Sequence, residues 1–281
     1  MSYKFTLGRQ YLMPTHFGPM SGPRHTPDGK RFSDPDDRTK ETYTVRFLST
    51  EDALNAILPD GFVLEGEPFV SVTFSYISNI AWLAGRGYNM LGVSVPARLK
   101  ARDRDVVGPF LLVLWENLAD PIITGREQLG FNKIYCELPE PSTSGGNTTL
   151  RAAWLGHQFA VMRVRDLKPQ PTAVGQPHDP SCERASLLHL RYFPTVGDGA
   201  EAVVCEPVIS PLKSATGKVE ALLRGEGDID FLETRWEDMP TQFHVVEGIR
   251  RLPMLANRGA EYCRFKGGGD NYFQEAIEAA A

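Results

Sequence analysis

The main pattern along the chain is the apolar alternation that is typical of β-strands. The run FVSVTF at residues 69–74 is rich in β-branched and aromatic residues, FLLVLW occupies residues 110–115, and residues 150–164 alternate more loosely. Residues 187–193 and 202–209 repeat the pattern, with the turn-rich VGDGA between them. These segments predict a mainly β fold of the α+β class, with antiparallel strands and a few peripheral helices.

Helical patterns are few. Residues 51–58 form the first, and Pro59 ends it. Residues 274–280, which follow the glycines at 267–269, form the clearest other one. Helix is therefore expected only at the margins of the fold.

The chain divides into three parts. Residues 12–40 are dense in Pro, Gly and charge and lack an apolar period, so residues 1–40 are expected to form an extended N-terminal arm. An ordered arm of this length must pack on something, and a neighbouring subunit is one candidate. Residues 41–266 carry the strand patterns and are expected to form one β domain. Residues 267–281 are expected to form a glycine hinge and a C-terminal helix.

Charge and composition exclude several classes of function. The net charge is -5 and the sequence pI is about 5.7, so the chain lacks the basic face that nucleic acid or an anionic membrane requires. The N-terminus lacks the apolar stretch of a secretory signal, and no run approaches the roughly 18 residues of a membrane span, so a cytoplasmic location is expected. The 4 cysteines and 6 histidines are scattered, which argues against a metal site.

One lysine stands in unusually apolar company. Lys133 lies in TGREQLGFNKIY, where Leu129, Phe131, Ile134 and Tyr135 are candidate walls of a pocket. A free lysine has a pKa of about 10.4, and full burial lowers such a pKa by roughly 3 to 5 units. The neutral amine then attacks ketones or keto acids and forms an imine, whose cationic nitrogen acts as an electron sink. Local sequence alone favours a different interpretation, a solvated lysine at a strand edge.

The stretch around this lysine resembles a known signature. The segment GREQLGFNK, residues 125–133, resembles the G-R-E-x-x-x-x-P-K-K motif of the acetoacetate decarboxylase family, in which the first lysine forms the Schiff base. Lys133 occupies that position. Other similar stretches are DALNAILP (52–59), the Glu67-Pro68 turn, YNMLGVSVP (88–96) and RYFPTVGDGAEAVVCEPVI (191–209). The resemblance spans about residues 40 to 265 and implies a double-layered antiparallel β cone or barrel, no cofactor, and a homo-oligomer, either dimer or tetramer.

The chain departs from the family pattern at several positions. The second lysine of the motif is replaced by Ile134, so burial alone would have to lower the pKa of the nucleophile. The two active-site glutamates of the family match Thr73 and Met90, which are expected to line the substrate site. The family's arginine falls near Lys40 or Arg38. Loss of both carboxylates favours retained imine chemistry without the original decarboxylation.

Some members of the family resemble aldolase-dehydratases. The resemblance therefore implies that Lys133 captures pyruvate or a related 2-oxo acid, and that the enamine then adds to an aldehyde before loss of water; the reverse reaction cleaves an unsaturated keto acid. Two alternatives remain. One is a β-keto-acid decarboxylase whose acid comes from elsewhere, such as Glu65 or Glu67. The other is a barrel that binds a small molecule without turnover.

Four further residues are candidates for the site. Tyr262 matches the late strand in which lyase-like relatives carry a catalytic tyrosine, and its phenol could shuttle protons. Gln128 could hydrogen-bond a substrate carbonyl, and Arg126 could bind a carboxylate or merely pair with other charges. His16 lies in an arm that could reach a pocket. Without the resemblance, Tyr262 would be read as an ordinary strand tyrosine and His16 as a packing residue.

Overall fold

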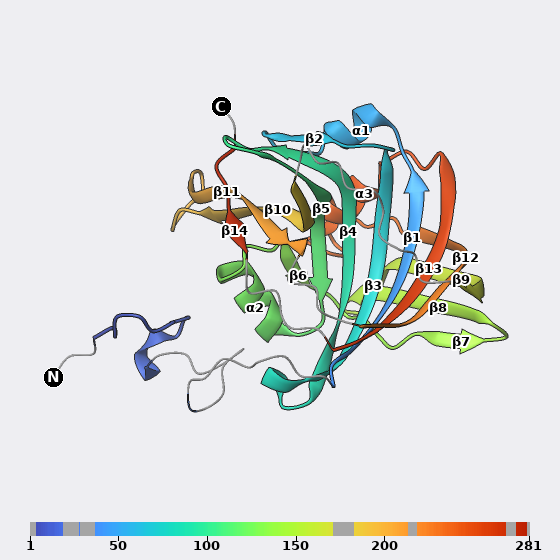
Figure 1. The fold of residues 1–281 in the computed structure, drawn as a ribbon, viewed down its shortest axis with the longest axis horizontal. Helices are drawn as coiled ribbons and strands as arrows, with labels where there is room; N and C mark the ends of the chain where they lie inside the picture. Colours follow the sequence, from blue (N-terminus) through green and yellow to red (C-terminus); the bar gives the residue numbers. More distant parts are fainter. Residues whose placement is uncertain are drawn as a thin grey trace.

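The fold is one large β-sheet with short helices at its margins (Figure 1). The computed structural model describes residues 4–18, 28, 37–170, 183–212, 218–267 and 274–279. The strands are β1 (Thr39–Leu48), β2 (Phe62–Leu64), β3 (Phe69–Ile80), β4 (Arg86–Lys100), β5 (Asp105–Glu116), β6 (Lys133–Tyr135), β7 (Ser142–Ser144), β8 (Asn147–Trp154), β9 (His157–Pro169), β10 (Glu183–Pro194), β11 (Ala202–Pro211), β12 (Lys218–Phe231), β13 (Ala256–Lys266) and β14 (Glu275–Ala276). The predicted mainly β class is confirmed, and the VGDGA turn joins the antiparallel pair of β10 and β11.

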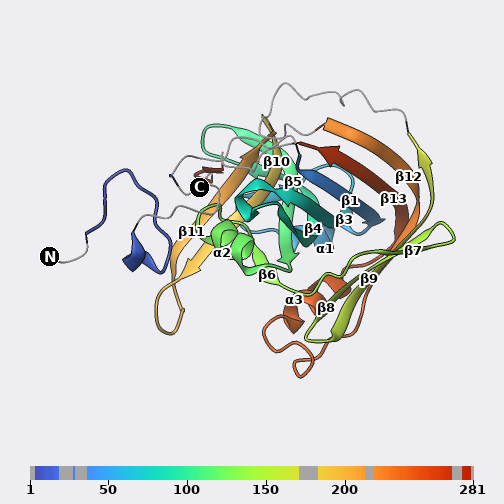
Figure 2. The same ribbon diagram turned by 90° about the horizontal axis from the view of Figure 1, so that it is seen from below.

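The strand order is β14-β11-β10-β5-β4-β3-β1-β13-β12-β9-β8-β7, with β2 on β4 and β6 on β5. Most pairs are antiparallel, but β5 runs parallel to both β6 and β10. Figure 2 shows the sheet bending strongly from β11 round to β9. In the described part of the chain, the two edge strands β14 and β7 do not pair, so the sheet is an open, curved path and not a closed barrel.

The helices are α1 (Glu51–Asn55), α2 (Ala119–Glu127) and α3 (Phe243–Arg250), with 3-10 turns at η1 (Thr15–Phe17) and η2 (Ala81–Leu83). The predicted first helix is confirmed as α1, although it ends earlier than expected. The Thr50 hydroxyl caps it by accepting a hydrogen bond from the Ala53 amide at 3.3 Å. The sequence did not predict α2 or α3. The sequence of α2, ADPIITGRE, contains proline, glycine and β-branched residues, all weak helix formers.

The expected C-terminal helix is wrong for residues 274–279. Instead, Glu275–Ala276 forms strand β14 on the edge of β11, and Ala279 bridges to Ala101. Arg104 and Arg102 pair with Glu275 and Glu278 at 2.8 and 3.2 Å. A helix this short is marginal in water, whereas an open sheet edge offers the segment backbone partners.

The expected N-terminal arm is described only in part. Residues 4–18 lie beside the sheet and away from its strands (Figures 1 and 2). Four apolar side chains of this stretch are largely exposed, namely Phe5, Leu7, Met13 and Phe17. Packing of the arm on a neighbouring subunit stays a prediction.

Register assigns each strand residue to one of two faces, because directly paired residues project to the same side. The pairing of Phe74 with Leu91, and of Leu91 with Trp115, builds the core face, where all three side chains are fully buried. The opposite face carries Thr73, Gly92 and Leu114 in one row, and Leu114 in turn pairs with Lys133. This second side of the sheet is called the lysine face below.

The core face is tied to β6 by a buried amide. The Trp115 indole donates to the Gln242 carbonyl at 2.8 Å, and the Gln242 amide donates to the Tyr135 carbonyl at 2.9 Å. Replacing Gln242 with leucine should lower the free energy of unfolding by about 1 to 3 kcal/mol, because the buried indole N–H and the carbonyl both lose their partners. Urea titration measures the loss. The surface variant Gln170→Leu serves as control, and an equal effect of both substitutions would contradict this role.

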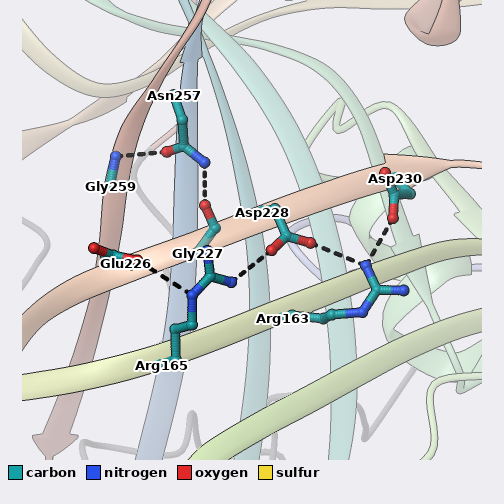
Figure 3. A network of polar contacts seen from close by, with 8 residues as sticks. All are labelled: Arg163, Arg165, Glu226, Gly227, Asp228, Asp230, Asn257 and Gly259. Carbon is teal, nitrogen blue, oxygen red and sulfur yellow. Dashed lines mark hydrogen bonds and ion pairs between the residues drawn. The ribbon is translucent and has the colours of Figure 1, made fainter.

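A surface network also fixes the pairing of β9 with β12 (Figure 3). Arg163 bridges Asp228 and Asp230 at 2.9 and 2.7 Å, while Arg165 contacts Asp228 at 2.8 Å and Glu226 at 3.2 Å. Partial burial opposes ionisation of Asp228, but hydrogen bonds from the two guanidinium groups hold its pKa below the usual value. These pairs are exposed, so they define register more than they add stability.

Candidate active site

Lys133 is a buried lysine at the first position of β6. Only 4% of the surface of Lys133 is exposed. The ammonium nitrogen Nζ lies 2.8 Å from Oε1 of Glu116 and donates a hydrogen bond to the Pro121 carbonyl at 3.0 Å. The Phe131 ring centroid lies 5.4 Å from Nζ. The interpretation of Lys133 as a solvated strand-edge residue is therefore wrong.

The G-R-E segment shapes the space in which this lysine lies. Gly125, near the end of α2, has no side chain where the lysine passes; a Cβ there would lie 2.6 Å from both Cε and Nζ of Lys133. Arg126 donates from Nη1 to the backbone carbonyl of Lys133 at 2.8 Å. The Phe131 amide donates to the Gly125 carbonyl at 3.0 Å, which folds the loop back on the helix. Arg126 thus holds the backbone that carries the nucleophile.

Glu116 is the site residue that the sequence did not reveal. It is the last residue of β5, and its side chain is fully buried beside Nζ. Register places it opposite Met90 on one side and Tyr135 on the other. The only signal in the sequence was a single acid directly after the apolar run FLLVLW. Burial favours the neutral amine of Lys133 whereas a carboxylate at this distance favours the ammonium, so the two residues titrate as a pair.

An aromatic stack borders the lysine. The His189 imidazole, fully buried on β10, stacks on Phe131 with ring centroids 4.4 Å apart. Its Nδ1 donates to the Gly130 carbonyl at 2.8 Å. Burial lowers the pKa of His189 to about 4, although the hydrogen bonds to Gly130 and Gln274 oppose the shift. His189 is therefore neutral at pH 7, and it adds no charge beside Lys133.

Thr73 and Met90, which were expected to line the substrate site, share the lysine face. Thr73 lies in the row of Lys133, with its hydroxyl 2.9 Å from that of Thr44. Met90 lies in the row of Glu116 and is also paired with Ser75. A second lysine, Lys40, lies further along this face through its pairing with Ile77. Burial, and secondarily Arg38, lowers the pKa of Lys40 to about 8.

Three of the candidate residues are not brought to Lys133. Tyr262 pairs with Tyr43, which pairs with Phe74, so its phenol lies on the core face and donates to Glu41 at 2.9 Å. Burial and this carboxylate raise the pKa of Tyr262 well above its usual value. The one-residue alternation of a strand, which a motif match does not fix, explains the difference.

His16 and Gln128 lie elsewhere. His16 is exposed and lies in the turn η1 of the arm. Gln128 is half-buried at the C-cap of α2, where its backbone N–H donates to the Thr124 backbone carbonyl at 3.0 Å. Within the described ranges, no hydrogen bond joins the Gln128 side chain to Lys133 or Glu116.

A pocket of about 270 Å³ lies beside the motif and presents two guanidinium groups, Arg126 and Arg191, next to Phe131 and Asn132. Lys133 does not line it. Among the described residues, no cluster of His, Cys, Asp and Glu is arranged to hold a metal ion. No helix in the described ranges combines the length and apolar character needed to cross a membrane.

Comparison with solved structures finds the same fold in several proteins. The acetoacetate decarboxylase from Legionella pneumophila is 17% identical, with a TM-score of 0.62, over 93% of this chain and 92% of that one. The enduracididine biosynthesis enzyme MppR complexed with pyruvate is 16% identical, with a TM-score of 0.61, over 91% and 96% of the two chains. MppR complexed with the condensation product of pyruvate and imidazole 4-carboxaldehyde is 15% identical, with a TM-score of 0.61, over 92% of this chain and 95% of that one.

Comparison with curated protein sequences gives no significant match. The family model for acetoacetate decarboxylase, in contrast, matches residues 12–257, which include the buried lysine, its carboxylate partner and the whole G-R-E segment. The chain therefore belongs to the acetoacetate decarboxylase family.

Proposed function

We propose that this protein is a cofactor-independent lyase that forms a Schiff base at Lys133 with pyruvate or a related 2-oxo acid. The observation that carries the proposal is the burial of Nζ between Glu116, the Pro121 carbonyl and the Phe131 ring. A lysine is rarely buried to this extent without a function that needs its amine. Membership of the family supports enzymatic activity.

Nucleophilic attack by the amine on the keto carbon and loss of water give an imine. Loss of a proton from the adjacent carbon then gives an enamine, which adds to an aldehyde. Dehydration of the adduct gives an unsaturated keto acid, and the reverse sequence is a hydration followed by retro-aldol cleavage. The similarity to MppR, whose solved complexes contain pyruvate and a pyruvate–aldehyde condensation product, supports this substrate class.

A β-keto-acid decarboxylase is the second candidate, favoured by the family name of the matching model. Its suggested acids are committed elsewhere: Glu65 forms an ion pair with Arg98 at 2.9 Å, and Glu67 forms one with Arg258. Thr73 and Met90 offer no carboxylate on the lysine face. A protein that binds small molecules without turnover remains the third candidate.

The test compares products. We expect pyruvate with an aromatic aldehyde to give a conjugated product that absorbs in the near ultraviolet, with little release of carbon dioxide from acetoacetate. The opposite pattern would identify a decarboxylase. Neither activity, in a protein that still binds pyruvate by calorimetry, would favour passive binding.

We further propose a homo-oligomer, in which the exposed apolar residues of the arm pack against a second copy. Light scattering of the full chain should give the mass of a dimer or tetramer, and deletion of residues 1–18 should reduce that mass. A monomer mass for the full chain at micromolar concentration would contradict assembly.

A further inference from the structure

We propose that Glu116 is the acid–base residue of this site, which moves protons between Lys133 and the bound substrate. The inference rests on the proposed function, because it assigns proton transfer in the same imine chemistry. None of the residues that the sequence suggested as partners of Lys133 places a carboxylate beside the Lys133 amine. Glu116 does so from the end of β5, at 2.8 Å.

The placement of Glu116 suits proton transfer better than passive pairing. Both side chains are almost completely excluded from water, and a buried ion pair is costly to desolvate. Transfer of one proton from Nζ to Oε1, which lie 2.8 Å apart, converts the ion pair into a neutral amine and a neutral acid. That one step produces both the nucleophile and the acid that the next step needs.

The same carboxyl group serves each later step with protons balanced. The amine adds to the keto carbon, the carbonyl π-electrons move to oxygen, and a proton passes from nitrogen to that oxygen to give a carbinolamine. Glu116 in its acid form protonates the hydroxyl, water leaves, and the iminium ion and the Glu116 carboxylate remain. The carboxylate then takes a proton from the adjacent carbon, which gives the neutral enamine and returns Glu116 to its acid form.

Among the described residues, the other polar groups near Lys133 are less suited to this role than Glu116. His189 on β10 is neutral, as burial lowers its pKa to about 4, and its Nδ1 hydrogen is directed at the Gly130 carbonyl. Burial, with Glu137 and Glu116, raises the pKa of the Cys136 thiol well above its usual value. The Arg126 guanidinium on α2 donates to the backbone carbonyl of Lys133. Tyr135, which pairs with Glu116 in register, is 42% exposed.

The experiment separates imine formation from proton transfer. Wild type, Glu116→Gln, Glu116→Asp and the control Glu67→Gln are incubated with pyruvate in deuterated buffer. Exchange of the pyruvate methyl protons is followed by NMR, and borohydride trapping is followed by mass spectrometry. Glu67 is a matched control because its side chain is 51% exposed and forms an ion pair with Arg258 and not with Lys133. Thermal melts verify that each variant is folded.

We expect Glu116→Gln to form the trapped adduct, and to do so at lower pH than wild type, because no carboxylate then favours the ammonium form. Its methyl exchange should fall by about 100-fold or more, the usual contribution of a positioned base. The exchange rate should fall less in Glu116→Asp, and the rate in Glu67→Gln should equal that of wild type.

Exchange at the wild-type rate in Glu116→Gln would overturn the assignment. Loss of the adduct and of exchange together, in folded Glu116→Gln, would also overturn it, because Glu116 would then only position the amine. Failure of wild type to form any adduct is a distinct result that contradicts the proposed function itself. If Glu116→Gln does not fold, Glu116→Asp decides: undiminished exchange with the carboxylate withdrawn by one methylene would count against proton transfer.

Discussion

Replacing Gly125 with alanine should lower kcat/KM by about 100-fold or more while the protein stays folded. The new Cβ would lie 2.6 Å from Cε and Nζ of Lys133, closer than side-chain carbons approach other atoms. Because the clash is with the end of a flexible side chain, the lysine moves and the backbone does not. The amine then leaves its position beside Glu116, and a displacement of about 1 Å is enough for such a loss.

Gly248→Ala is the matched control for this variant. Gly248 lies inside α3, and a Cβ there meets no atom within 4 Å. Alanine is the better helix former by about 1 kcal/mol, so this variant should keep full turnover and melt no lower than wild type. Steady-state kinetics and thermal melts of the two variants decide the matter. Full activity in Gly125→Ala would show that the close fit of glycine and lysine is irrelevant to turnover.

Replacing Lys133 with methionine should abolish turnover, by about four orders of magnitude or more, because the thioether cannot form the proposed imine. Methionine keeps much of the volume but leaves the fully buried Glu116 carboxylate without its cation. An uncompensated buried charge costs about 3 kcal/mol or more at neutral pH. The loss should be smaller at pH 5 than at pH 8, because Glu116 in this variant accepts a proton more readily in the folded state than in the unfolded state.

The double variant Lys133→Met with Glu116→Gln tests the origin of that loss. It removes both charges, so most of the stability should return while turnover stays absent. Urea titrations of the two single variants and the double variant give the coupling energy directly. Additive losses would mean that the two side chains do not interact, contrary to the 2.8 Å contact.

The sequence predicted the parts of this molecule that depend on local pattern. Strand alternation indicated the β class, the pattern of residues 51–58 predicted the first helix, and the resemblance of the segment at residues 125–133 to a family motif, rather than the local sequence alone, pointed to a buried Lys133. Each of these signals lies within a few residues of the feature it describes.

The parts that the sequence missed depend on register and on distant contacts. Glu116 precedes Lys133 by a helix and a loop, and only the parallel pairing of β5 with β6 brings the two together. Tyr262 was placed at the site by its motif, yet a shift of one residue in a strand decides which face a side chain occupies. Helix α2 forms from weak helix formers because packing on β5 and β6 overrides local propensity.

The curvature and the open edge of the sheet also depend on contacts between distant parts of the chain. A closed barrel suits alternating strands, but closure requires pairing between the first and last strands. Here the last described segment joins β11 as a short added strand, and the edge strand β7 spans only Ser142–Ser144. Neither feature has a local signal.

The proposed chemistry depends on a covalent bond between the buried amine of Lys133 and a keto acid. The most direct measurement is the mass of the wild-type protein after incubation with pyruvate and borohydride, followed by peptide mapping. We expect one reduced pyruvate adduct per chain, located on Lys133 and absent from Lys133→Met. An unmodified protein, or an adduct carried by another lysine such as Lys40, would contradict it.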